Sequence, residues 1–142
     1  MSAYVDSSFL VSSYITDVRS ERADTCMSNS PSVSLTDFNR AELANAIFQQ
    51  VFLKRLTAVD ADRVWTNFRH DCDNGVRIGV RFPDQAWETC AALARRYGST
   101  LGMRTLDSLL VACALELKVD RFWTFDERQA RLAEAVGLDS NP

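Results

Sequence analysis

Apolar and polar residues recur along the chain with two periods, one typical of helices and one typical of strands. The clearest helical stretch begins near Leu106, where apolar residues recur every three or four positions and most residues between them are apolar too. A helix with so little polar surface is expected to be buried. Thr105 is its predicted N-cap, which places Asp107 in the first turn. The residues that define this pattern are Leu106, Leu109, Leu110, Val111, Ala112, Cys113, Ala114, Leu115 and Leu117.

Short β-prone runs lie between the helical stretches. The predicted strands, the third of which could also be an extended segment, are Ala3 to Val5, Val33 to Leu35, Val76 to Phe82 and Arg121 to Thr124. Each is bounded by polar or turn-forming residues. Strands that alternate with helices imply an α/β fold with a mainly parallel sheet and helices on both faces. The length indicates one domain over residues 1–142.

The predicted helices follow these strands. One follows Asp6, with Ser7 or Ser8 as its cap, and another is opened by Thr36 or Asp37. Two further helices are expected over Asp60 to Arg69 and from Pro83 to about Tyr97. The segment from Asp17 to Ser32 is expected to be mainly loop, with a helical turn near Arg19 to Asp24, and residues from about 137 are expected to fray.

Four acidic residues are expected to converge at one edge of this fold. Asp6 and Asp126 each follow a predicted strand, and Glu42 and Asp107 lie in the early turns of helices. Ligands of parallel α/β sheets bind outside the carboxyl ends of the strands. Each acid also has a structural explanation. Asp107 could interact with a helix dipole, Asp126 could cap the next helix with Gln129 at capping-box spacing, and Glu42 could be a solvated surface residue.

Converging carboxylates without a matching cation indicate a metal site. Their mutual repulsion would raise their pKa values or require a bound cation, and all-oxygen ligands select Mg²⁺ or Mn²⁺. Such an ion activates water and neutralises charge on a phosphate, which is nuclease chemistry. A zinc site is not expected, because His70 is the only histidine and the four cysteines (Cys26, Cys72, Cys90 and Cys113) form no C-x-x-C pair.

The remaining composition limits the setting. No secretion-type leader or long apolar run is present in this sequence, so a cytoplasmic protein with no membrane contact is expected. The net charge is −3, yet fourteen arginines stand against two lysines. Arginine forms bidentate contacts with phosphate and carboxylate, so this bias permits a nucleic-acid surface or ion-paired protein contacts.

Three acidic blocks resemble those of the PIN-domain ribonucleases, most closely the VapC-type toxins of bacterial toxin-antitoxin pairs. They are AYVDSSFLVSSYI, SLTDFNRAELANAI and TLDSLLVACALELKVDRFWTFDERQ, in the family's order. The resemblance implies a three-layer α/β/α PIN-like fold. It also implies that Asp6, Glu42, Asp107 and Asp126 bind one or two divalent cations and direct water to an RNA phosphodiester.

The resemblance also implies partners and auxiliary residues. It suggests a tRNA or rRNA substrate, a homodimer, and a cognate antitoxin bound in an apolar groove near Trp65 or Phe68. Ser7 and Thr124 would support the metal ligands or backbone phosphates. Arg104 could contact a phosphate, or instead form an ion pair with Asp107 or another acid. Leu110 occupies a position that is often histidine in relatives.

Two other functional classes compete with the nuclease. A PIN-like module without catalysis could bind RNA or protein, although a binding surface has no need of concentrated, unneutralised acids. A phosphatase or phospho-receiver would need a D-x-D motif after the first strand or a lysine ending a later strand. Asp6-Ser7-Ser8 and the two lysines, Lys54 and Lys118, supply neither.

Overall fold

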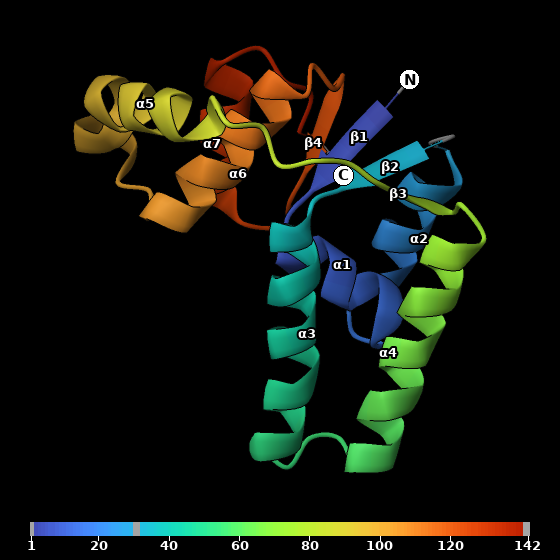
Figure 1. The fold of residues 1–142 in the computed structure, drawn as a ribbon. Coiled ribbons are helices and arrows are strands. Elements are labelled where there is room, and N and C mark those ends of the chain that lie inside the picture. Colours follow the sequence, from blue (N-terminus) through green and yellow to red (C-terminus); the bar gives the residue numbers. More distant parts are fainter. Residues whose placement is uncertain (1, 30–31, 141–142) are drawn as a thin grey trace.

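The computed structural model describes residues 2–29 and 32–140 and has a four-stranded sheet at its centre (Figure 1). The strands are β1 (Ser2–Val5), β2 (Ser32–Leu35), β3 (Arg77–Gly79) and β4 (Arg121–Trp123). All of them are parallel, in the order β3-β2-β1-β4. The predicted α/β fold with a mainly parallel sheet is therefore confirmed.

Seven helices are described, and they cover both faces of the sheet (Figure 1). They are α1 (Ser7–Tyr14), α2 (Ser20–Ser28), α3 (Asp37–Phe52), α4 (Ala58–Asp73), α5 (Ala86–Leu101), α6 (Thr105–Glu116) and α7 (Glu127–Ala135). Among these helices, none has both the length and the apolar character needed to cross a bilayer.

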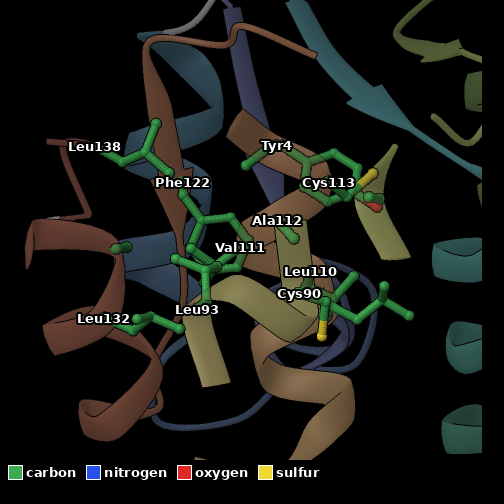
Figure 2. Close-up of a cluster of buried hydrophobic side chains, with 14 of the residues drawn as sticks. Tyr4, Cys90, Leu93, Leu110, Val111, Ala112, Cys113, Phe122, Leu132 and Leu138 are labelled. Carbon is green, nitrogen blue, oxygen red and sulfur yellow. The ribbon is translucent and has the colours of Figure 1, made fainter. Parts of the chain in front are cut away.

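Alternating side chains of the strands divide the interior into two cores. Ala3 and Val5 of β1 pack with α1, α2, α3 and α4, whereas Tyr4 packs with α5, α6 and α7 on the opposite face. Phe122 and Trp123 of β4 alternate in the same way. Figure 2 shows the second of these cores, with Tyr4 and Phe122 among the side chains of the helices. The result is the predicted three-layer α/β/α arrangement.

Helix α6 is buried, as its apolar pattern predicts. Every residue from Ser108 to Ala114 is buried. The predicted cap is displaced by one residue, because Arg104 occupies the N-cap position and Thr105 is the first residue of the helix. Asp107 still lies in the first turn.

Several helix boundaries differ from the prediction. The segment expected to be mainly loop contains the full helix α2, which buries Ala23 against the core. Its polar composition hid this helix from pattern analysis. Residues 30 and 31 of that segment lie outside the described residues. The cap of α1 is Asp6 rather than Ser7 or Ser8, since Asp6 Oδ1 accepts the backbone N–H of Phe9 at 3.0 Å.

Helix α5 also differs from the prediction at both ends. It begins at Ala86, three residues after the predicted start at Pro83, and continues through Gly98 to Leu101. Packing of Leu101 against the core outweighs the cost of about 1 kcal/mol for a glycine inside a helix. Gly102 then ends the helix in the left-handed conformation, with φ of 64°.

Residues 137–140 do not fray as expected. Leu138 and Ser140 are buried, and the carbonyl of Asp139 accepts the backbone N–H of Phe122 at 2.9 Å, which extends the contacts of β4. The two last residues of the predicted tail lie outside the described part of the chain.

The strand order places the topological switch point between β1 and β4. The chain leaves β1 across the face covered by α1 to α4 and reaches β4 from the face covered by α5 and α6. Diverging connections open a crevice at the carboxyl ends of these two strands. Asp6 and Asp126, which follow β1 and β4, flank this crevice.

Candidate active site

The four predicted acids line one pocket of about 530 Å³ at the carboxyl edge of the sheet. They come from four different parts of the chain: the end of β1, helix α3, helix α6 and the start of α7. The pocket is lined by Asp6, Ser7, Ser8, Arg19, Glu42, Arg104, Thr105, Leu106, Asp107, Phe125 and Asp126. We call it the four-acid pocket. Ser7 and Arg104 are among the lining residues, whereas Thr124 is not.

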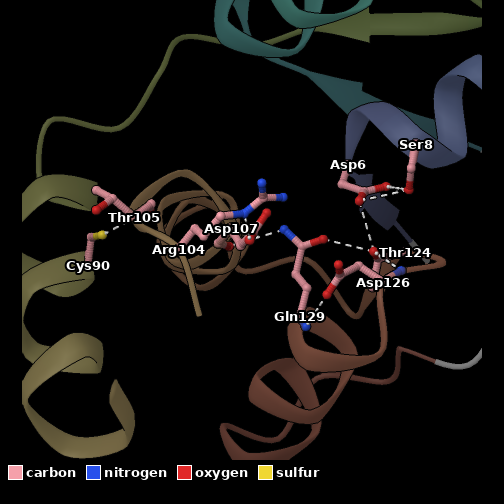
Figure 3. Close-up of polar contacts among 9 residues, drawn as sticks. All are labelled: Asp6, Ser8, Cys90, Arg104, Thr105, Asp107, Thr124, Asp126 and Gln129. Atoms are coloured by element: carbon pink, nitrogen blue, oxygen red, sulfur yellow. Dashed lines mark hydrogen bonds and ion pairs between the residues drawn. The ribbon is translucent and has the colours of Figure 1, made fainter. Parts of the chain in front are cut away.

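Asp6 is the most buried of the four acids, with 7% of its surface exposed. Both of its carboxylate oxygens accept hydrogen bonds. Ser8 donates to Oδ1 at 2.8 Å and to Oδ2 at 2.9 Å, and Thr124 donates to Oδ2 at 2.8 Å (Figure 3). Together with the bond from the backbone N–H of Phe9, these contacts fix the direction of the carboxylate.

Thr124 connects Asp6 to the two acids on the other side of the switch point. Its hydroxyl lies 2.8 Å from Oε1 of Gln129 and accepts the backbone N–H of Asp126 at 3.0 Å. The Gln129 amide donates to the backbone carbonyl of Asp107 at 3.1 Å (Figure 3). A fully buried glutamine therefore ties the starts of α6 and α7 together. The sequence marked Gln129 only through its spacing from Asp126.

Asp126 caps helix α7, as its structural explanation predicts. Its Oδ1 accepts the backbone N–H of Gln129 at 2.8 Å. Asp107 accepts a hydrogen bond from Arg104, whose Nε lies 3.3 Å from Oδ2. This contact is the ion pair that was predicted for Arg104 as the alternative to a phosphate contact. The Arg104 side chain is 82% exposed, so the pair adds little to stability.

Glu42 points into the pocket with an unsatisfied atom. Its Oε1 is buried and has no hydrogen-bond partner in the described part of the chain. Burial raises the pKa of Glu42, the negative charges of Asp6 and Asp107 raise it further, and a hydrogen bond from Ser7 opposes the shift. A buried carboxylate oxygen without a donor is costly unless a proton or a cation satisfies it. Glu42 is therefore a partly buried residue of the pocket and not a fully solvated one.

The same forces act on Asp6. Burial raises its pKa, the hydrogen bonds from Phe9, Ser8 and Thr124 lower it, and the charge of Asp126 raises it. Burial is the largest of these effects. Asp6 and Glu42 thus share an ionisation that is disfavoured mainly by burial and, to a smaller extent, by neighbouring negative charge.

The donor set fits a hard divalent cation in chemistry. Four carboxylates, one with an orphaned oxygen and two with raised pKa values, are the ligands that Mg²⁺ and Mn²⁺ prefer. Residues 2–29 and 32–140 contain no group of three acids, cysteines or histidines already drawn close enough to hold an ion. Like charges repel, and here Asp107 and Asp126 each accept a hydrogen bond from a residue three positions away in the sequence.

Three residues of this region were not identified as site residues from the sequence. Ser8 orients Asp6, Gln129 connects the helix starts, and Arg19 lines the pocket from the N-cap of α2. Arg19 lay in a segment expected to be mainly loop, so only its residue type could have drawn attention to it. Leu110, at the position that is often histidine in relatives, is buried in the core and does not line the four-acid pocket.

We expect Glu42→Gln to stabilise the metal-free protein at pH 7.5 and to lose that advantage in acid. The folded-state pKa of Glu42 lies above its ordinary value of 4.5, so ionisation disfavours the fold at high pH and protonation removes this penalty as pH falls. A midpoint higher by about 2–4 °C than wild type is expected in thermal unfolding.

The difference between the two proteins should close below about pH 4.5. Asp62→Asn, which neutralises an exposed acid of α4, is the control and should leave the midpoint close to that of wild type at both pH values. A Glu42→Gln midpoint equal to or below that of wild type at pH 7.5 would contradict the electrostatic account of the pocket.

Comparison with known proteins assigns the family. The profile of the PIN domain matches residues 3–135, which include all four acids and all of the four strands except Ser2. PIN domains are generally nucleases and typically use divalent metal ions. No curated protein sequence matches the chain. The profile covers nearly the whole chain, and the fold agrees with it, so the chain belongs to the PIN-domain family.

Proposed function

We propose that this PIN domain is an endoribonuclease that depends on Mg²⁺ or Mn²⁺, with Asp6, Glu42, Asp107 and Asp126 as its metal-binding and catalytic residues. The observation that carries the proposal is that these four carboxylates, from four separate elements, line one pocket at the switch point of the sheet. The raised pKa values of Asp6 and Glu42 support it, because burial and neighbouring negative charge both disfavour their ionisation and a bound cation would offset both effects.

Each residue has a distinct part in this proposal. Asp6 is held by Ser8 and Thr124 and provides a fixed ligand on one side of the pocket. Glu42 has an oxygen with no hydrogen-bond partner among residues 2–29 and 32–140 and provides a ligand from α3. Asp107 and Asp126 complete the set from the other side of the switch point. Ser7 and Thr124 support the acids, and Arg104 is free to exchange its exposed ion pair for a phosphate.

When bound, a divalent ion would lower the pKa of water and stabilise the charge that develops on the phosphate. The chain contributes position and electrostatics. Its carboxylates would orient the hydrolytic water, and the hydrogen bonds to Asp6 keep that carboxylate in one direction. The RNA strand would reach the pocket from its open, solvent-facing side.

We further propose that the protein acts as a growth-inhibiting toxin that a cognate antitoxin neutralises. Large exposed hydrophobic residues lie where α3 ends and α4 begins: Phe48, Phe52, Leu53 and Val59. This end of the α3–α4 hairpin extends away from the sheet (Figure 1). Exposed apolar side chains in one region are typical of a protein contact.

The residues first suggested for this contact need one correction. Phe68 is buried, with 1% of its surface exposed, so it packs in the core instead of binding a partner. Trp65 is only partly buried and lines a shallow pocket with Arg40 of α3. We therefore propose that the antitoxin contacts Trp65 and the apolar end of the hairpin. A homodimer, suggested by the family resemblance, remains a prediction for sedimentation analysis.

Purified wild-type protein, free of antitoxin, should cleave total cellular RNA into discrete products with Mg²⁺ or Mn²⁺, and EDTA should abolish the cleavage. Asp6→Asn and Asp107→Asn should each reduce the rate by about 10²-fold or more, the scale for loss of one charge-stabilising group in an active site. Sequencing of the product ends identifies the RNA and the cleaved bond.

The control variant is Asp62→Asn, whose carboxylate lies outside the pocket and should leave the rate unchanged. If folded wild type neither cleaves RNA nor binds Mn²⁺ in calorimetry, the nuclease proposal is wrong. That outcome would instead favour a PIN-like module that binds RNA or protein without catalysis.

Induced expression of the wild-type protein in cells that lack the antitoxin should stop colony formation, and Glu42→Gln should restore it because a ligand of the proposed ion is lost. Both proteins must be present at equal levels by immunoblot. Normal growth with confirmed expression of active wild-type nuclease would contradict the toxin role while leaving the ribonuclease activity intact.

A further inference from the structure

Arg19 lies at the boundary between the four-acid pocket and a second pocket. The second pocket, of about 410 Å³, lies between α2 and α7, and we call it the α2–α7 pocket. Both pockets are lined by Arg19, Phe125 and Asp126. A ligand that extends from one pocket into the other therefore passes the residues that the two pockets share, and Arg19 is the only cation among them.

An aromatic stack holds Arg19 in this position. Its guanidinium carbon lies 5.2 Å from the centre of the Phe125 ring, and the Phe125 ring stacks on Phe9 at 5.2 Å with an angle of 20° between the planes. Phe9 is fully buried in the core. The backbone N–H of Arg19 also donates to Asp17 Oδ1 at 2.7 Å. The guanidinium thus rests on a rigid support, which lowers the entropic cost of binding a ligand.

Arg19 differs from Arg104, the other arginine of the four-acid pocket. Arg104 is paired with Asp107 at 3.3 Å, whereas no carboxylate within residues 2–29 or 32–140 lies within 4.0 Å of the Arg19 guanidinium. A guanidinium supported through its face keeps the N–H groups at its edge available. Those groups match the oxygens of a phosphate in a bidentate contact.

The α2–α7 pocket is better suited to a base and ribose than to another phosphate. Three acids line it, Asp126, Glu127 and Glu134, and they outnumber its two arginines, Arg19 and Arg22. The pocket therefore carries a net negative charge, and Val18 and Ala130 add apolar surface. A strand whose cleaved phosphate lies at the four acids would then place its neighbouring phosphate over Arg19 and its next nucleoside in the second pocket.

We propose that Arg19 binds the backbone phosphate next to the cleaved bond and directs the adjoining nucleoside of single-stranded RNA into the α2–α7 pocket. This inference rests on the proposed ribonuclease function. It gives α2, an element that buries a single residue, a role as the segment that carries a substrate contact. The acids would carry out the chemistry, and Arg19 would position the strand.

The test compares Arg19→Ala with wild type on a short single-stranded RNA that contains the mapped cleavage site. We expect KM to rise about tenfold or more, the scale of a charge-assisted hydrogen bond, with kcat little changed. The salt dependence of binding should weaken, with the slope of log K against log salt concentration smaller by about 0.7 for one lost phosphate contact. Arg19→Lys should recover part of the affinity because it keeps the charge.

Arg96→Ala is a matched control, since the Arg96 guanidinium also lies over an aromatic ring, that of Tyr97 at 5.3 Å, but outside both pockets. It should leave KM and the salt slope unchanged. Arg19 is exposed, so Arg19→Ala should unfold at the wild-type midpoint.

The outcomes separate this inference from the proposed function. Cleavage by Arg19→Ala with wild-type KM and salt slope would overturn the inference and leave the ribonuclease standing. Tighter Mn²⁺ binding by Arg19→Ala with unchanged KM would also overturn it, because Arg19 would then be a counter-charge to the acids. If wild type cleaves no RNA, the function fails, and fluorescence anisotropy with the same RNA decides the role of Arg19: unchanged affinity in Arg19→Ala overturns it.

Discussion

Burial of neighbouring carboxylates at one edge of the sheet is the constraint on which the rest of this structure depends. The fold places four acids in one pocket, and burial together with their mutual charge raises the pKa values of Asp6 and Glu42. Such a cluster weakens the metal-free protein, since two side chains ionise there less readily than in water. Sites that bind a ligand often retain features that cost stability.

The surrounding contacts hold the acids in place despite this repulsion. A chain of polar contacts from Asp6 through Thr124 and Gln129 to the backbone of Asp107 joins β1, β4, α6 and α7 in a buried region. On the other side, the buried Asn39 side chain accepts the backbone N–H of Thr36 and donates to the carbonyl of Val5, both at 2.8 Å. This contact ties the start of α3, and hence Glu42, to the end of β1.

Much of the fold follows from the sequence because its strongest signals are local. Three local signals were sufficient to predict the layers and the parallel sheet: the apolar run of α6, the β-prone residues before Asp6 and the polar residues after each strand. The four acids could be placed at one edge because each follows a strand or opens a helix. Helix α2 could not be predicted at its full length, since its sequence is polar and Ala23 is its only buried residue.

The supporting residues were harder to identify than the acids. Gln129, Ser8 and Arg19 act through contacts with residues that the fold brings near, and nothing in their own sequence neighbourhood distinguishes them from capping or surface residues. Phe68 shows the reverse problem. Its position on an amphipathic helix is compatible with a place in the core or in an interface. The ring contacts with Trp65 and Tyr14 in the structure show that it lies in the core.

The central claim is that the four carboxylates together bind a divalent cation. A crystal structure of the protein grown with Mn²⁺, with diffraction data collected at the manganese absorption edge, tests it most directly. The account predicts an anomalous peak inside the four-acid pocket, within coordination distance of Asp6 and Glu42 and of Asp107 or Asp126, directly or through a water. A pocket without a peak at saturating Mn²⁺, or a peak bound only by other residues, would contradict it.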